Sequence, residues 1–155
     1  MRILVAIGCV LVFAASTSTS ATAACRATKL RANGFAVARP ANAGIAGGWS
    51  WQTTDGRALL YAGGVGPGGI NMKIPWWVKR RWGSSLTVSG RRIGAAGSFR
   101  QTFPAALGLS SHPPGYLAVF PSIVDVPTAG CWRLTVSTGN LAGVLVVKVV
   151  ARPRG

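Results

Sequence analysis

Two strand-like runs near the C-terminus constrain the fold more than any other part of the sequence. In the first, 126–136, apolar residues alternate with small or polar ones from Cys131 onward, which is the pattern of a strand with one buried face. The turn that follows, Thr-Gly-Asn at 138–140, has two residues that tolerate a positive φ. The second run, 141–150, is apolar on both faces, so we expect a covered strand rather than an exposed edge. Together they predict the closing hairpin of a β-sandwich.

The rest of the chain continues in the same manner. After residue 24 no apolar period of 3.6 persists for three turns, and the chain's 21 glycines and 9 prolines interrupt it at short intervals, as in all-β sandwiches. We therefore predict an all-β fold of antiparallel strands in one domain, residues 24–155. Within it, residues 24–48 are the least patterned and are predicted to form an extended N-terminal arm, and residues 151–155 form a basic tail.

The N-terminus predicts export. Arg2 precedes an apolar run, and Ala21-Thr22-Ala23 fits the small-x-small rule for signal-peptide cleavage. A membrane-spanning helix needs about 20 apolar residues, which is more than the run 3–15 provides. Residues 1–23 are therefore predicted to be a signal peptide, and no transmembrane span is expected after its removal. The mature protein would be secreted or held at the cell envelope.

Two cysteines, Cys25 and Cys131, remain after the signal peptide is removed. An even number of cysteines in an exported domain favours a disulfide between them. A second chemistry competes for Cys25, because the sequence 22–25, Thr-Ala-Ala-Cys, resembles a lipobox, whose cysteine becomes the lipidated first residue of the mature protein. Thr22 occupies the place of the usual Leu in that motif. We expect the disulfide and keep lipid anchoring through Cys25 as the alternative.

Basic residues greatly outnumber acidic ones in this chain. The chain has 17 Lys and Arg against two Asp and no Glu, for a net charge of +15. Such a balance favours anionic surroundings, meaning nucleic acid, anionic glycans, or acidic lipid and wall polymers. Most of the basic residues are Arg and they are scattered along the chain, so codon bias or solubility accounts for the charge equally well.

The densest group of basic and aromatic residues lies around one turn. The strand before it contains Pro75, Trp76 and Trp77. Since proline cannot donate to a ladder, we expect the strand to end, bulge or lie at an edge there. The two tryptophans should face opposite sides of the sheet, and an exposed indole beside guanidinium groups can stack on a ring while arginine pairs with phosphate or carboxylate. The candidate binding residues are Trp77, Lys79, Arg80, Arg81, Trp82, Arg91 and Arg92.

This candidate site has an alternative. Both tryptophans could be buried in the sandwich, as tryptophan usually is, and the basic turn would then be only a solvated loop. Arg91 and Arg92 end the strand that follows the turn. A strand of that length separates its ends by about 20 Å, so these two arginines are expected at a different edge from the turn.

Catalytic residue types are scarce. A carboxylate pair would have to combine Asp55 with Asp125, which come from different turns. A zinc site needs three or four ligands, and the two cysteines are expected to be bonded to each other. His112 lies beside serines in a Pro-rich loop, without a nucleophile-elbow motif. We therefore predict no catalytic site, no metal and no cofactor, with a small hydrolase that uses His112 as the alternative.

Several motifs together resemble a family of small exported bacterial proteins of unknown function, many of them lipoproteins. The motifs are Lys-x-Pro-Trp-Trp at 73–77, Leu-Thr-Val-Ser-Gly-Arg-Arg at 86–92 and Pro-Thr-x-Gly-Cys-Trp-x-Leu-Thr-Val at 127–136, with Cys25 near the mature N-terminus. The resemblance covers most of the chain after the signal peptide. It implies an immunoglobulin-like antiparallel β-sandwich and pairing of Cys25 with Cys131, and it implies no activity.

These observations predict an exported, non-enzymatic module at the cell envelope that binds an anionic polymer or glycan. The alternative is a structural envelope protein that its charge holds to wall polymer without a defined site. Salt separates a specific glycan binder from nonspecific electrostatic attachment, because such attachment fades steeply as ionic strength rises.

Overall fold

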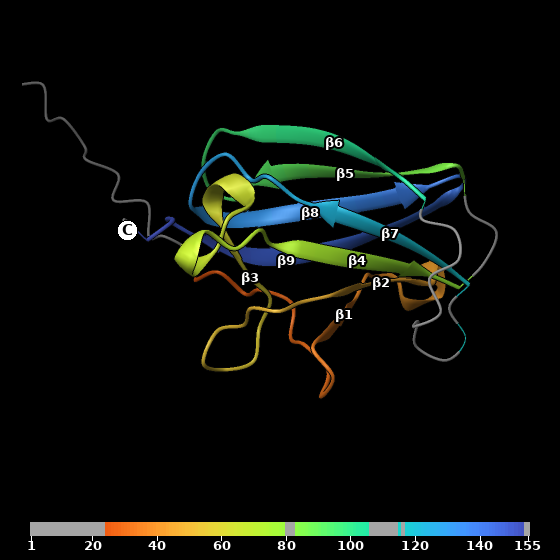
Figure 1. Ribbon diagram of the computed structural model, residues 1–155, viewed down its shortest axis with the longest axis horizontal. Helices are drawn as coiled ribbons and strands as arrows, with labels where there is room; N and C mark the ends of the chain where they lie inside the picture. Colours follow the sequence, from red (N-terminus) through yellow and green to blue (C-terminus); the bar gives the residue numbers. More distant parts are fainter. Residues whose placement is uncertain (1–23, 80–82, 106–114, 116, 154–155) are drawn as a thin grey trace, which may run out of the picture.

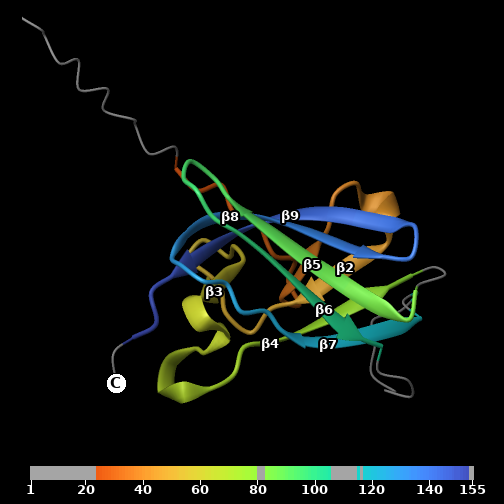
Figure 2. The same ribbon diagram turned by 90° about the horizontal axis from the view of Figure 1, so that it is seen from above.

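The computed structural model describes residues 24–79, 83–105, 115 and 117–153, and in this part of the chain two β-sheets pack face to face (Figure 1, Figure 2). One sheet has the strand order β1 (Phe35–Val37), β2 (Ile45–Gly48), β4 (Lys73–Val78), β7 (Ala118–Ile123). The other has the order β3 (Leu59–Tyr61), β9 (Leu141–Val150), β8 (Gly130–Thr138), β5 (Ser85–Arg92), β6 (Ser98–Pro104). Short 3-10 helices, η1 (Ala41–Ala43), η2 (Ala62–Gly64) and η3 (Pro67–Gly69), lie in the connections. The prediction of an all-β, sandwich-like fold is confirmed.

The closing hairpin forms as predicted. β8 and β9 pair antiparallel along their whole length, and the turn between them uses Gly139 at a φ of 55°. Trp132, Leu134 and Val136 share the inward face of β8 and are fully buried. β9 lies between β8 and β3, and the two valines of its outward face, Val144 and Val146, are half-buried.

Inward side chains of the two sheets form one core. Trp132 on β8 and Trp76 on β4 are both fully buried, one from each sheet. The Nε1–H of Trp132 donates to the carbonyl of Thr128 at 2.9 Å, and that of Trp76 donates to the hydroxyl of Ser122 at 2.9 Å. Because both indoles are buried with their polar atoms satisfied, truncating either to alanine should cost about 3–5 kcal/mol.

Trp77 lies on the opposite face of β4, as alternation predicts, but it is not exposed there. Only 8% of its surface is accessible, and it packs with Phe35, Ala46 and Val119 on the outer face of the four-stranded sheet. Its ring centroid is 4.6 Å from that of Phe35. Gly48 makes room for the indole, since a Cβ at that position would lie 2.6 Å from the ring. Both tryptophans of the pair are therefore buried, but Trp77 lies on the outer face of its sheet and not between the two sheets.

Two expectations about strand layout need correction. Residues 24–48, predicted as an extended arm, contain β1 and β2 of the four-stranded sheet. These short strands are rich in Ala and Gly, so they show little alternation of apolar and polar side chains. Small residues are needed there, because a Cβ on Gly47 would lie 2.8 Å from the ring of Trp76. The sheets are also not wholly antiparallel, because β3 pairs in parallel with β9.

Pro75 neither ends β4 nor lies at an edge. The strand runs through it, between β2 and β7. On one side, the ladder with β2 ends at the Gly47–Trp76 pair, immediately before the proline. On the other side, Pro75 is opposite Pro121, which also lacks an N–H. Pro75 therefore lies where the ladder with β2 has stopped, and opposite a residue with which it can exchange no N–H···O bond.

Candidate functional site

A groove of about 920 Å³ lies where the segment after Cys25 crosses the edge of the five-stranded sheet. Val144 and Val146 of β9 line it together with residues 26–29, Arg31 and residues 37–41. No acidic or aromatic residue of the described chain lines it. The basic residues that line it are Arg26, Lys29, Arg31, Arg39, Arg57 and Arg133.

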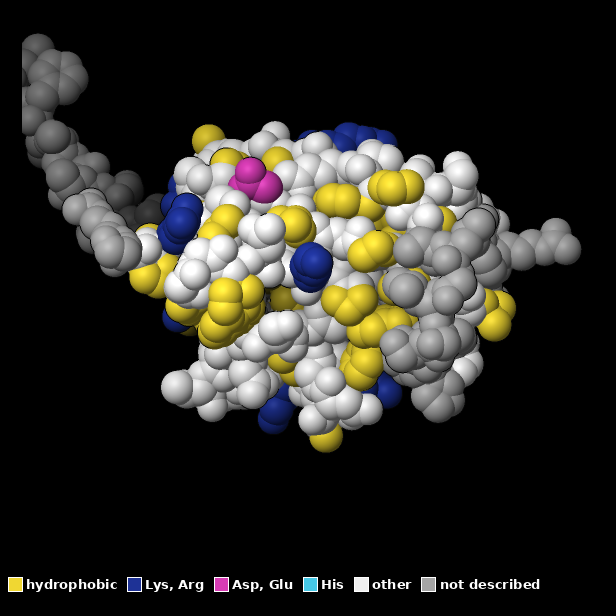
Figure 3. All heavy atoms as spheres, viewed as in Figure 1, with side chains coloured by type: hydrophobic (Ala, Val, Ile, Leu, Met, Phe, Trp, Pro, Cys, Tyr) yellow, Lys and Arg dark blue, Asp and Glu magenta, His cyan; other side chains and the backbone are white. Residues whose placement is uncertain are grey.

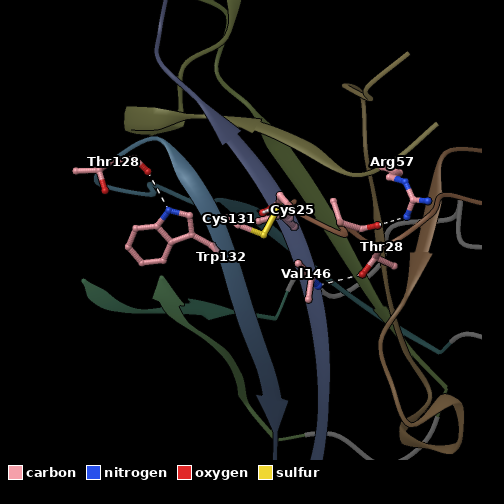
Figure 4. The surroundings of a disulfide bond; sticks show 9 residues. Cys25, Thr28, Arg57, Thr128, Cys131, Trp132 and Val146 are labelled. Carbon is pink, nitrogen blue, oxygen red and sulfur yellow. Dashed lines mark hydrogen bonds between the residues drawn. A yellow bond between two sulfur atoms is a disulfide. The ribbon is translucent and has the colours of Figure 1, made fainter. Parts of the chain in front are cut away.

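Backbone pairing at the edge of β9 creates this groove. The N–H of Arg39 donates to the carbonyl of Val144 at 2.9 Å, and the reciprocal bond is 2.8 Å. Two residues further along β9, the carbonyl of Val146 accepts from the N–H of Thr28 at 2.7 Å, and the N–H of Val146 donates to the Thr28 hydroxyl at 2.9 Å (Figure 4). The chain from 28 to 39 thus leaves and rejoins β9 at positions about 7 Å apart. The segments at these attachment points form the two walls of the groove. The first wall consists of residues 26–29 and Arg31, and the opposite wall consists of residues 37–41.

The disulfide fixes the start of the first wall. Cys25 is bonded to Cys131 on β8, with an S–S distance of 2.08 Å and a Cα–Cα distance of 5.4 Å (Figure 4). Cys131 and Arg133 lie on the outward face of β8, because the alternate residues of that strand face the core. Arg26 directly follows the bonded Cys25. The bond therefore brings Arg26 to the same side of the sheet as Arg133.

Arg57 has a structural role in the groove. Its Nη1 donates to the carbonyl of Ala27 at 2.7 Å, and its Nε pairs with the carboxylate of Asp55 (Figure 4 shows the guanidinium beside the N-terminal segment). The Thr53 hydroxyl donates to the same carboxylate. The hydrogen bond from Thr53, and then that from Arg57, lower the pKa of Asp55 below its ordinary value of 3.8. Arg57 thus ties the wall to the turn 53–57, and Asp55 neutralises its charge.

The other five basic side chains have no such partner. Arg26, Lys29, Arg31, Arg39 and Arg133 are exposed, and none forms a side-chain hydrogen bond or ion pair with any residue that the structure describes. Charges of one sign in a concave site focus the electrostatic potential and attract counter-ions. The planar guanidinium of arginine offers two parallel N–H groups to an oxyanion. The groove can therefore bind several anionic groups without first breaking internal ion pairs.

Four of the residues predicted as a binding site are described by the structure, and these four do not form one exposed cluster. Trp77 is buried, whereas Lys79, immediately after β4, is exposed. Arg91 and Arg92 end β5, whose length separates them by about 20 Å from the turn at its start. This separation agrees with the expectation that the two arginines belong to a different edge. Arg80, Arg81 and Trp82 of the basic turn, and His112, lie outside the described residues.

The groove is not predictable from the sequence alone. The run 26–31 stands out as basic, but the three arginines that complete the lining are isolated in the sequence. The cysteine pair was the available signal, since a Cys25–Cys131 bond brings Arg26 near the strand that carries Arg133. Placing the remaining arginines requires the pairing order at the edge of β9.

Basic side chains are sparse on one face of the molecule. On the face in Figure 3, the Lys and Arg side chains of the coloured residues are few and set apart, and several stand at its margins. Hydrophobic side chains lie scattered between them. On this face the coloured basic side chains do not gather into one patch.

Other kinds of site have less support. Within the described ranges, no three His, Cys, Asp or Glu side chains are grouped as metal ligands would be. No helix in this part of the chain is long and apolar enough to cross a membrane. Comparisons with protein-family models, with curated proteins and with solved structures find no match to this chain. The resemblance carried by the sequence motifs stays a prediction, and the site is interpreted from its own geometry.

Proposed function

We propose that this protein is an exported, non-enzymatic binding module of the cell envelope and that its groove holds an anionic partner. One observation carries the proposal: five basic side chains line a single groove and have no ion-pair partner in the described part of the chain. A bound anion would relieve the repulsion between these like charges. Backbone hydrogen bonds to β9 hold both walls before any ligand arrives, so binding would cost little ordering of the protein.

The number of charges favours a partner with several anionic groups. A single small anion would neutralise one or two of the five side chains, whereas an anionic chain lying along the groove would reach all of them. A volume of about 920 Å³ is at the upper end of the range of about 300–1,000 Å³ typical of small-molecule sites. We therefore propose a polymer or an oligomer as the partner.

We also propose that the sandwich is immunoglobulin-like. With β4, β5, β7, β8 and β9 taken as strands B, C, E, F and G, strand B lies beside E in one sheet, and G, F and C are consecutive in the other. Immunoglobulin domains have the same neighbours. In those domains the disulfide joins strands B and F, whereas here it joins strand F to the segment before β1. The disulfide therefore serves the wall of the groove rather than the two sheets.

Export is supported by this bond, because disulfides persist in oxidising compartments and are rare in the cytosol. The lipid-anchor alternative needs the same sulfur of Cys25, so a molecule carries either the disulfide or the lipid. Intact-mass measurement of the natively exported protein separates them: reduction adds two hydrogens to the disulfide form. A diacylglycerol mass on Cys25 would contradict the disulfide assignment.

The experiment that tests the groove compares two variants that lose the same charge. The groove variant carries Arg26→Ser, Lys29→Ser and Arg31→Ser. The turn variant removes the three consecutive cations Lys79, Arg80 and Arg81 in the same way. Binding of inorganic polyphosphate and of oligogalacturonate is measured by calorimetry at low salt. The groove variant should bind on the order of tenfold more weakly or worse, at about 0.5–1 kcal/mol for each lost ion pair, and the turn variant should bind like the parent.

Each other outcome has a definite meaning. Equal losses in both variants would contradict the groove and favour a structural protein held by charge alone. A loss confined to the turn variant would place the site at the turn. No binding of either polyanion by the parent would refute the proposed function. Circular dichroism and thermal unfolding are the controls for folding. Both variants should fold, because single surface substitutions usually change stability by no more than about 0.5 kcal/mol.

A further inference from the structure

The side chains around the groove are cationic and aliphatic but not aromatic. Beside the basic residues, the lining contributed by the described chain consists of Ala, Val, Leu, Pro and Thr. Proteins that bind single-stranded nucleic acid stack bases on aromatic side chains. The groove offers no such platform for a base, nor an aromatic face for a sugar ring, so its ligand must be recognised by charge and by aliphatic contact.

Arginine dominates the cationic part, since only Lys29 among the five unpaired side chains is not an arginine. The guanidinium fork matches two oxygens of one oxyanion, whereas the ammonium of lysine acts as a point charge. A phosphodiester presents two such oxygens at every repeat of its backbone. The composition of the groove therefore suits a chain whose charge lies in the backbone itself.

The spacing of the cations along the groove also favours a phosphodiester chain. Lys29 and Arg31 are alternate residues of the segment that pairs with residues 56–58, so their Cα atoms are about 7 Å apart if that segment is extended. The opposite wall joins β9 at Val144, two residues from the attachment at Val146. A three-carbon polyol phosphate chain places successive phosphates at a comparable interval. The aliphatic side chains of the two valines can then contact the carbons between them.

We infer that the groove binds a phosphodiester-linked polyol chain, a linear polymer that alternates phosphate with a short acyclic alcohol. This inference rests on the proposed function, because it names the chemistry of the anionic partner in the same groove. Phosphates would pair with the five unpaired cations, Arg26, Lys29, Arg31, Arg39 and Arg133, and the polyol carbons would lie against Val144 and Val146. The groove does not recognise this ligand by stacking on aromatic side chains.

The test uses four soluble probes of equal charge number and one membrane probe. The soluble probes are a glycerol phosphate oligomer, an abasic deoxyribose phosphate oligomer, oligo-thymidylate and oligogalacturonate. Vesicles of phosphatidylglycerol present the same glycerol phosphate group on a lipid surface. Binding to the parent and to the groove variant defined above is measured at 50 and 200 mM salt.

The glycerol phosphate oligomer should bind most tightly, and the abasic oligomer should bind as well as oligo-thymidylate. With five phosphate contacts, a fourfold rise in salt should weaken binding about 100-fold, at a slope of about 0.7 per contact. The groove variant retains two of the five unpaired cations and should weaken only about 7-fold over the same range. The slope of the logarithm of the binding constant against the logarithm of the salt concentration thus gives the number of phosphate contacts, whatever the absolute affinity.

Several results would overturn the inference while leaving the proposed function intact. Oligogalacturonate that bound in the groove as tightly as glycerol phosphate would remove the preference for phosphodiesters. Oligo-thymidylate that bound about tenfold tighter than the abasic chain would indicate base stacking. Binding confined to vesicles would replace the polymer by a lipid surface. If none of the probes bound the parent, the proposed function itself would fall.

Discussion

Removal of the Cys25–Cys131 bond is the perturbation with the largest predicted effect on stability. The two cysteines are separated by 106 residues in the sequence. In the chain-entropy model, a cross-link that closes a loop of this size stabilises the folded state by about 4–5 kcal/mol, because it restricts the unfolded chain. The Cys25→Ser, Cys131→Ser double variant should lose about that much free energy of unfolding.

This free energy converts to a large shift in melting temperature. For a domain of this size a loss of 1 kcal/mol lowers Tm by about 3–5 °C, so the double variant should melt about 15–20 °C below the oxidised parent. Urea unfolding should also give a larger m-value, since the unfolded chain without the bond is more expanded. Both quantities are measured by circular dichroism, with parent reduced under native conditions as a control of identical sequence.

A second effect of the same variant is local. Without the bond, the start of the first wall is held by Thr28 on β9 and by the contact from Arg57 to Ala27. We therefore expect polyphosphate binding to weaken while the core remains folded. Thr28→Ala is the matched control, because it removes one hydrogen bond to Val146, worth about 1 kcal/mol, and leaves the disulfide intact. A double variant that lost less than about 1 kcal/mol and kept full binding would refute this account of the bond.

Three further substitutions test other parts of the molecule. Gly47→Ala should destabilise the fold by about 1–3 kcal/mol, because the new methyl would lie 2.8 Å from the fully buried ring of Trp76; urea unfolding measures the loss, and an unchanged midpoint would contradict the packing. Thr53→Ala should raise the ionisation midpoint of Asp55 toward 3.8 in an NMR titration, because the Thr53 hydroxyl is the largest cause of the lowered pKa. A depressed carboxyl pKa contributes stability that is present above the unfolded pKa and lost as pH falls through the folded one, so this acid-sensitive contribution should shrink in the variant. His112→Ala should leave Tm and polyanion binding unchanged, and loss of a measurable function at unchanged stability would reopen the hydrolase alternative.

The strands that the sequence predicted well are those with one buried face. Leu86 and Val88 on β5, and Trp132 and Leu134 on β8, alternate with exposed or half-buried residues and are all fully buried. A shift of one residue in register would turn every such side chain outward. Local alternation therefore specifies both the strand and its orientation, without knowledge of its neighbours.

Strands whose identity depends on a distant partner were not predictable in this way. β1 and β2 are only three and four residues long, too short to show a period. β3 pairs in parallel with the end of β9, about ninety residues away in the sequence. Pro75 lies inside a sheet opposite Pro121 and just beyond the end of the ladder with β2, and neither neighbour is close to it in the sequence. Such features follow from pairing order, which local pattern does not contain.

The same distinction explains why the sequence did not indicate the groove that we propose as the anion site. Lys79, Arg80 and Arg81 are adjacent in the sequence, but adjacency in the sequence does not by itself make charged side chains converge on one ligand. In the groove, Arg39 and Arg133 come from segments almost a hundred residues apart, yet Val144 and Val146 of β9 pair with them directly. Residues 26–31 approach from the other side through the disulfide. Charges that converge on one concave surface act together on a ligand, and this convergence is the physical reason to expect binding at the groove.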